Sequence, residues 1–148
     1  MNITDFIRIA QEEDLYVVLR PGPYICAERE MGGLPYWLLQ FHPDIYLRSN
    51  DPNYLQYVER WTGVLFNELE PLWNGNGGPI ITVQVENEFG FYTSCDKEYT
   101  AWLRDLFQRY IGDKAVLFTT DGPGDGSLGC GKIEGELQSG GSGIYILP

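Results

Sequence analysis

Apolar residues recur along this chain in two patterns that alternate, a helical spacing and a short continuous run. Near the start, apolar side chains occupy positions i, i+3, i+4 and i+7 of one helical face: Ile3, Phe6, Ile7 and Ala10. This spacing predicts an amphipathic helix, with Thr4 or Asp5 accepting the free amides of its first turn. The apolar run 15–19 then predicts a buried strand, which ends at Pro21 and Pro23 because proline cannot donate to a ladder.

The same two patterns continue to residue 120. They predict a short helix from Pro35 to Leu39, a helix from Asp51-Pro52 to about Glu70, a strand over 79–85, a helix over 99–110 that ends at Gly112, and a strand over 115–120. Strands that alternate with helices long enough to cross over indicate a parallel sheet, because parallel neighbours cannot be joined by a tight turn. The chain is therefore expected to be an α/β protein.

The pattern is lost after residue 121. Nine of the 18 glycines fall between residues 122 and 143, and no helical or strand period survives there. We therefore expect residues 1–121 to form the packed domain and residues 122–148 to form a Gly-rich loop or tail. The apolar run 144–147 could begin a further strand, but four residues do not decide this.

Charge and hydropathy restrict the possible partners. The chain has 21 acidic and 10 basic residues, a net charge of −11 and no cluster of Lys or Arg. Nucleic acid is therefore not an expected partner, since binding its phosphates requires clustered cations. No apolar run approaches the roughly 20 residues that cross a bilayer, and residues 1–5 lack the basic and apolar stretches of a signal peptide.

The cysteines and the single histidine do not suggest a metal site or a cofactor. Cys26, Cys95 and Cys130 have no CxxC spacing, so neither a zinc knuckle nor a dithiol redox motif is supported. His42 follows Phe41 and is expected to be a surface residue. We expect no metal and no cofactor.

Polar side chains follow each predicted strand directly: Arg20 after the first, Glu86-Asn87-Glu88 after the second and Asp121 after the third. In parallel α/β folds this end of the strands is where ligands bind. Carboxylates gathered with a carboxamide suit general acid/base chemistry on a polar substrate. The alternative is that these residues are polar simply because strand ends meet solvent.

Four strings of sequence carry a specific resemblance: RPGPYICAE (20–28), MGGLP (31–35), GGPIITVQVENEFG (77–90) and LFTTDG (117–122). In this order and spacing they closely resemble the glycoside hydrolases of family 35, especially the animal β-galactosidases. The resemblance continues through Cys130-Gly131 to about Gly135. It implies a fragment of a (β/α)8 TIM barrel, roughly strands 3 to 5 with their helices, in residues 1–121.

The resemblance also implies an activity. Complete members are exo-acting, retaining enzymes that remove terminal β-galactose from oligosaccharides, glycoproteins or glycolipids, in the lysosome or outside the cell. By this resemblance Glu88 is the acid/base and Asn87 binds the hydroxyl next to the anomeric carbon. Ala27 and Glu28 help to hold the galactose, and the pocket is expected to be lined by the neighbouring residues of the same loop, Tyr24, Ile25 and Cys26.

Spacing alone does not distinguish Glu86 from Glu88; the resemblance favours Glu88 as the acid. A general acid must stay protonated at the working pH, so the pKa of Glu88 is expected to rise from about 4.3 towards about 6. The apolar strand, Phe89 and the charge of Glu86 would each disfavour its ionisation. Glu86 is expected to be a structural carboxylate paired inside the fold.

Other positions carry weaker expectations. Position 29 is Arg where the family has Trp, so Arg29 is expected to pair with Glu28 or Glu30 in place of an aromatic contact. Core packing is expected for the four tryptophans: Trp37, Trp61, Trp73 and Trp102. Cys95 and Cys130 follow neighbouring strands, and the matching cysteines are bridged in animal relatives. We therefore expect a Cys95–Cys130 disulfide, with Cys26 reduced.

The second carboxylate of a retaining site is missing from these patterns. In the family the nucleophile lies in a Ser-Glu-aromatic string, and this chain contains no Ser-Glu pair. A complete barrel of this type needs roughly 250 residues, so the fragment is expected to be marginally stable and inactive by itself. The two functional hypotheses are a segment of a β-galactosidase and a non-catalytic truncated product that binds glycans or proteins.

Overall fold

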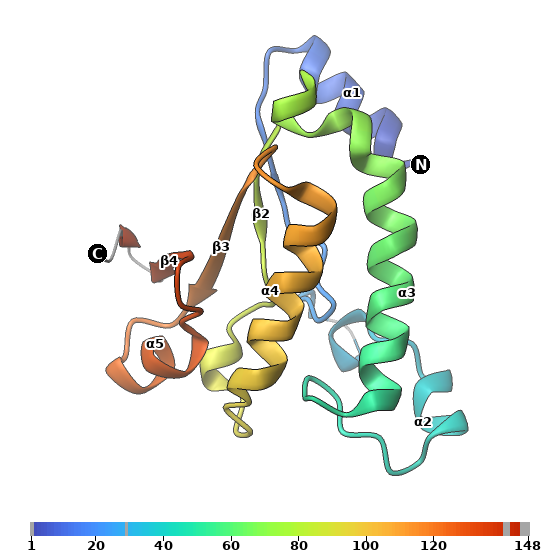
Figure 1. Cartoon of the computed structure of the whole chain (residues 1–148), viewed down its shortest axis with the longest axis vertical. Coiled ribbons are helices and arrows are strands. Elements are labelled where there is room, and N and C mark those ends of the chain that lie inside the picture. The colour runs from blue at the N-terminus through green and yellow to red at the C-terminus, as the bar shows by residue number, and fades with distance from the viewer. Residues whose placement is uncertain (1, 29, 141–142, 146–148) are drawn as a thin grey trace.

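A computed structural model describes residues 2–28, 30–140 and 143–145 (Figure 1). Its helices are α1 (Ile3–Glu12), α2 (Trp37–Phe41), α3 (Pro52–Leu69), α4 (Lys97–Ile111) and α5 (Asp125–Gly131). Its strands are β1 (Val17–Leu19), β2 (Ile80–Gln84), β3 (Val116–Asp121), β4 (Leu137–Gly140) and β5 (Gly143–Tyr145). Short 3-10 helices lie between them: η1 (Glu30–Gly33), η2 (Glu70–Leu72), η3 (Asn74–Asn76) and η4 (Phe89–Phe91).

The strands form one sheet in the order β1-β2-β3-β4-β5. Strands β1 to β4 are parallel, and β5 runs antiparallel to β4. Thr82 in β2 pairs with Val18 on one side and with Val116 on the other, and the register between β1 and β2 shifts between Val17 and Val18. The predicted parallel α/β architecture is confirmed for this part of the chain.

Side-chain caps fix where the helices begin. Asp51 accepts a hydrogen bond from the amide of Asn53 at the start of α3, and Asp96 accepts one from Tyr99 at the start of α4. The prediction that Thr4 or Asp5 caps α1 is wrong. The cap is Asn2, whose side chain accepts a hydrogen bond from the backbone amide of Thr4 at 3.1 Å. Asn2 precedes the helix in extended conformation, which is the geometry an N-cap requires.

The core lies between the sheet and the helices α3 and α4, which run side by side along it (Figure 1). Phe66 of α3 is at its centre, with ring centroids 4.8 Å from Phe107 of α4 and 5.3 Å from Trp73. Trp73 is fully buried and Trp102 packs against the core, as predicted. Trp37 and Trp61 are 42% and 51% exposed, so the prediction of core packing is wrong for these two.

Large apolar side chains are exposed along α1, the following turn and β1: Ile3, Phe6, Ile9, Leu15, Tyr16 and Val18. Of the apolar residues on the predicted α1 face, Ile7 is the buried one, with an exposed fraction of 2%. β1 is the edge strand of the sheet, so its outer side has no neighbouring strand among the described residues. In the described part of the chain, no helix is both long and apolar enough to cross a membrane.

Residues 125–131 and 137–140 form regular elements that the glycine content concealed, so the prediction of a loop or tail is wrong for these residues. Helix α5 covers 125–131, and β4 pairs with β3 from Phe118↔Leu137 to Asp121↔Gly140. A Cβ at Gly90 would collide with the carbonyl oxygen of Ser127, so glycine permits η4 and α5 to touch. Strand β5 overlaps the apolar run 144–147 at residues 144 and 145, and residues 146 and 147 of that run lie outside the described structure.

A disulfide between Cys95 and Cys130 joins the segment before α4 to the end of α5, and Cys26 is a free, exposed thiol. The same junction is held by Lys97, whose ammonium donates to the carbonyl oxygens of Gly129, Cys130 and Lys132 at 2.7–2.8 Å. These contacts attach the Gly-rich segment to the first turn of α4.

Removing this disulfide should destabilise the chain. Closing a loop of 35 residues restricts the unfolded state by about 3–4 kcal/mol, so Cys95→Ala with Cys130→Ala should lower the free energy of unfolding by a large part of that amount. Cys26→Ser is the matched control, because that thiol is exposed and free, and it should leave stability unchanged. Denaturant titration with non-reducing peptide mapping tests this, and equal effects of the two changes would contradict it.

Candidate active site

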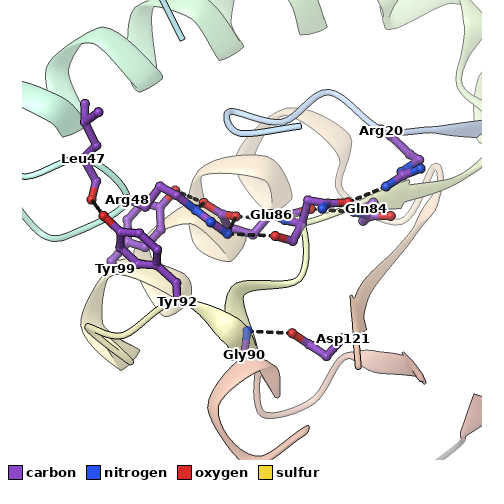
Figure 2. Close-up of polar contacts among 10 residues, drawn as sticks. Arg20, Leu47, Arg48, Gln84, Glu86, Gly90, Tyr92, Tyr99 and Asp121 are labelled. Carbon is purple, nitrogen blue, oxygen red and sulfur yellow. Dashed lines mark hydrogen bonds and ion pairs between the residues drawn. The ribbon is translucent and has the colours of Figure 1, made fainter. Parts of the chain in front are cut away.

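The carboxyl ends of β1, β2 and β3 bring the predicted polar residues together (Figure 2). Arg20, directly after β1, donates to the Oδ1 of Asn87, the third residue after β2. The amide of Glu88 donates to the carbonyl oxygen of Thr120 in β3 at 2.9 Å. The expectation that these strand ends share one rim therefore holds for Arg20 and the Glu86-Asn87-Glu88 string.

Glu86 is a buried structural carboxylate, as predicted. Glu86 is 2% exposed. Its two carboxylate oxygens accept hydrogen bonds from the Arg48 guanidinium at 3.3 and 2.7 Å, from the Tyr99 hydroxyl at 2.7 Å and from the backbone amide of Asn87 at 2.8 Å (Figure 2). Four hydrogen bonds satisfy the acceptor capacity of an ionised carboxylate. Glu86 is thus fully occupied within the protein and is not available to substrate.

The partner of Glu86 is Arg48, which sequence reasoning missed. Its guanidinium carbon lies 4.0 Å from the ring centroid of Tyr24 and 4.7 Å from that of Tyr92, so the charge is held against two aromatic rings. Arg48 also donates to the carbonyl oxygen of Asn87 at 2.7 Å. The Tyr92 hydroxyl donates to the carbonyl oxygen of Leu47 at 3.0 Å, which holds the segment that carries Arg48.

Burial and charge set the ionisation of this cluster. Burial alone would lower the pKa of Arg48, but the charge and hydrogen bond of Glu86 raise it above its ordinary value. Burial, followed by the charge of Glu86, raises the pKa of the Tyr99 phenol well above its usual range. Tyr99 therefore stays a hydrogen-bond donor to Glu86, and Arg48 and Glu86 form a charged pair.

Asn87 is hydrogen-bonded at its backbone N–H, at its backbone C=O and at its side-chain Oδ1. The Glu86 carboxylate accepts from its N–H and Arg48 donates to its C=O. Its Oδ1 accepts from Arg20 and, at 3.0 Å, from the Nε2 of Gln84. Its Nδ2 is buried without a hydrogen-bond partner among the described residues. The carboxamide is thus fixed in place with one donor group unused.

Glu88 is exposed and follows Asn87 in left-handed backbone conformation, with φ 47°. The enclosure expected around it is not present: Phe89 turns into the core, where it is 2% exposed, and the charge of Glu86 is paired with Arg48. The next turn is fixed by Asp121, whose Oδ1 accepts from the amide of Gly90 at 2.8 Å (Figure 2). Asp121 is therefore engaged with the backbone and 2% exposed.

Four non-glycine residues of this region share left-handed backbone conformation, with φ between 47° and 61°: Glu28, Arg48, Glu86 and Glu88. This conformation costs an ordinary residue roughly 1–2 kcal/mol, so it persists where surrounding contacts fix it. Such residues cluster at ligand and active sites. Here they mark the Glu86–Glu88 string, the residue that binds it and the loop after β1.

The loop after β1 holds the other predicted site residues in different environments. Tyr24 is half-buried against Arg48, whereas Cys26, Ala27 and Glu28 are exposed. Ile25 is 37% exposed and lines a pocket of about 370 Å³ with apolar residues of α2 and α3, including Trp37, Tyr57 and Trp61. Ala27, Glu28, Asn87 and Glu88 do not line that pocket. Arg29 and its expected pairing lie outside the described residues.

His42 was expected to be a surface residue, and the structure differs from that expectation. It is half-buried at the end of α2, and its Nε2 lies 3.0 Å from the Tyr57 hydroxyl. It contributes to the packing of α2 on α3 through this contact with Tyr57. Within the described ranges, no three His, Cys, Asp or Glu side chains are grouped so that they could hold a metal ion.

A parallel α/β sheet that collects carboxylates and a carboxamide at the carboxyl ends of its strands is typical of the catalytic face of barrel enzymes. The chain belongs to the glycosyl hydrolases of family 35, because the sequence model of that family matches residues 1–145.

Similarity to individual proteins supports the same family assignment. Over 134 residues, 90% of this chain, it is 56% identical to a beta-galactosidase of Macaca fascicularis and 55% identical to that of Homo sapiens. It is 52% identical to a beta-galactosidase-1-like protein of Mus musculus. The chain spans about a fifth of the length of each of these relatives.

Removing the Arg48 charge should unfold this region. Arg48→Met leaves Glu86 buried without its partner, which should cost about 3–5 kcal/mol of unfolding free energy. Adding Glu86→Leu should recover part of that loss, because it removes the unpaired charge. Arg109→Met is the matched control, since Arg109 and Glu59 pair on the surface with side chains 60% and 52% exposed, and it should change stability little.

Urea titration of the four proteins measures these differences. A similar small loss for Arg48→Met and Arg109→Met would show that the buried pair does not stabilise the fold.

Proposed function

We propose that this segment carries the acid/base half of a retaining β-galactosidase site, with Glu88 as the acid/base. The observation that carries the proposal is the fixed Asn87 peptide. It is bound at its N–H and C=O by the Glu86–Arg48 pair and places an exposed carboxylate next to a carboxamide with an unused donor. The exposed Glu88 carboxyl group can exchange protons with a substrate, whereas Glu86, buried and hydrogen-bonded within the protein, cannot.

The remaining proposed contacts come from the matching positions of the family. Asn87 would bind the hydroxyl next to the anomeric carbon. Ala27 and Glu28 would hold the galactose, and their exposure leaves them free to contact a ligand. A carboxylate such as that of Glu28 is a strong acceptor for sugar hydroxyls. Tyr24, Ile25 and Cys26 would line the pocket around the sugar.

The proposed reaction proceeds in two displacements. Glu88 first donates its proton to the glycosidic oxygen as the bond to the anomeric carbon breaks and a second carboxylate attacks that carbon. Glu88, now ionised, then removes a proton from water, whose oxygen attacks the anomeric carbon and releases the second carboxylate. Galactose leaves with its original anomeric configuration, and Glu88 is again protonated.

The second carboxylate is proposed to lie in a part of the protein other than this segment. A retaining site needs two carboxyl groups about 5–5.5 Å apart. The chain has no Ser-Glu string, and Asp121, the other carboxylate at a strand end, accepts a hydrogen bond from Gly90. In this proposal residues 1–121 supply roughly strands 3 to 5 of the barrel.

The expected substrates are terminal β-galactosides of oligosaccharides, glycoproteins or glycolipids, and the complete protein is proposed to act in the lysosome or outside the cell. The Cys95–Cys130 disulfide supports an oxidising compartment. The alternative is a non-catalytic product that binds glycans or proteins. The exposed apolar side chains of α1 and β1 are compatible with protein binding and equally with burial against the rest of a complete enzyme.

In a complete protein that contains this segment, Glu88→Gln should lower kcat by about 10²–10⁴-fold for galactosides with poor leaving groups, because the proton donor is lost. Substrates with activated leaving groups should be affected less, and added azide should restore part of their turnover. Glu68→Gln is the matched control, since Glu68 is an exposed glutamate of α3. Steady-state kinetics with both substrate types test the assignment, and equal turnover of the Glu88 and Glu68 variants would reject it.

The chain of residues 1–148 by itself should not hydrolyse galactosides, because the proposed site has one carboxyl group where two are needed. The measurement is release of an activated aglycone by the purified, folded monomer at acidic and neutral pH. Turnover well above background that disappears in Glu88→Gln would show that the second carboxylate lies within this chain.

A further inference from the structure

The side chain of Asn87 has a fixed polarity. Arg20 carries donors and no acceptor, so the Asn87 atom that it contacts must be the carbonyl Oδ1. Gln84 supports the same assignment, because its Nε2 also donates to the carbonyl oxygen of Glu86 at 2.7 Å, which can only accept. The Nδ2 group of Asn87 therefore faces away from both partners.

The carbonyl oxygen of Glu86 prevents Gln84 from reversing, and the Thr120 hydroxyl, which can donate or accept, donates to the oxygen that this orientation presents. The Oε1 of Gln84 accepts from the Thr120 hydroxyl at 3.2 Å, while its Nε2 serves Glu86 and Asn87. Rotating the Gln84 amide would place an oxygen against two carbonyl oxygens. The line Thr120–Gln84–Asn87–Arg20 thus crosses the ends of β1, β2 and β3 and gives the Asn87 carboxamide one orientation. Figure 2 shows Gln84 and Arg20 in this line.

The Nδ2 of Asn87 is the group that this line leaves unused. It is buried and has no partner among the described residues, and a buried donor without an acceptor is unfavourable. Because both acceptor positions of Oδ1 are filled by Arg20 and Gln84, a ligand that contacts the side chain meets a donor. A ligand oxygen that displaces the atoms covering Nδ2 would satisfy it.

We propose that Arg20 and Gln84 act as positioning residues that make Asn87 an obligatory hydrogen-bond donor, so that the site selects a sugar hydroxyl and rejects an ammonium at the contacted position. This inference rests on the proposed function, in which Asn87 contacts the hydroxyl beside the anomeric carbon. A hydroxyl oxygen accepts from Nδ2, whereas a protonated amine cannot and would lie close to the charge of Arg20.

The test uses the ¹⁵N-labelled chain of residues 1–148, with the Asn87 side-chain amide signal assigned by its loss in Asn87→Asp. Galactose and 2-amino-2-deoxygalactose are titrated separately at a mildly acidic pH that keeps the amine protonated. We expect galactose to shift the signal and to bind about tenfold more tightly or better. Asn87→Asp, which has no side-chain amide and is therefore followed by its backbone amide signals, should reverse the preference, because its carboxylate accepts from an ammonium.

Variants of Arg20 separate positioning from folding. Arg20→Met should reduce the discrimination several-fold because the carboxamide can then rotate, and Arg20→Lys should retain most of it. Arg8→Met is the control, since Arg8 is an exposed arginine on α1 paired with Asp5, and it should behave as the unmodified chain. Thermal unfolding by circular dichroism confirms that each variant is folded.

Equal affinity for the two sugars that Asn87→Asp leaves unchanged would overturn the inference. If the unmodified chain binds no galactose, the proposed function fails for this segment, and the side-chain amide decides the inference separately. Slow exchange of the Nδ2 protons that is lost in Arg20→Met but kept in Arg8→Met supports a fixed donor. Exchange at the rate of a solvent-exposed amide in the unmodified chain overturns it.

Discussion

Two opposite charges, Arg48 and Glu86, lie inside this protein with side chains only 8% and 2% exposed. Removing each ion from water costs several kcal/mol, and the pair stabilises the fold only if its remaining donors and acceptors are satisfied. Here they are satisfied by Tyr99 and by the backbone of Asn87, with aromatic rings around the guanidinium. The hydrogen bonds that satisfy the pair therefore also fix the backbone N–H and C=O of Asn87, beyond the end of β2.

The pair also connects parts of the chain that are distant in sequence. Arg48 precedes α3, Glu86 follows β2 and Tyr99 lies in the first turns of α4, so the packing of both long helices against the sheet determines where Asn87 lies. A displacement of either helix would expose or separate a buried charge. The left-handed conformations of Glu86 and Glu88 are held by this arrangement.

Strong periodicity made most of the fold predictable, because α3, α4 and the first three strands each bury one face or a continuous run. The burial and pairing of Glu86 could be expected from its place among strand residues, but its partner could not, since Arg48 lies 38 residues away in a segment without a period. Helix α5 was missed because three of its seven residues are glycines and hide the pattern, although only at Gly131 would a Cβ collide with a neighbour, Asp121. Periodicity also cannot tell which apolar face is covered, as the exposed Trp61 shows.

The antiparallel strand β5 limits how this sheet can be enlarged. It occupies the side of β4 on which a further parallel strand would pair, and any strand added beyond it would follow a reversed neighbour. The other edge, β1, is unoccupied among the described strands and carries the exposed Val18. With β5 in place, a polypeptide that extends the parallel order has one point of entry, so assembly with the rest of a barrel would proceed from the β1 side or require β5 to detach first.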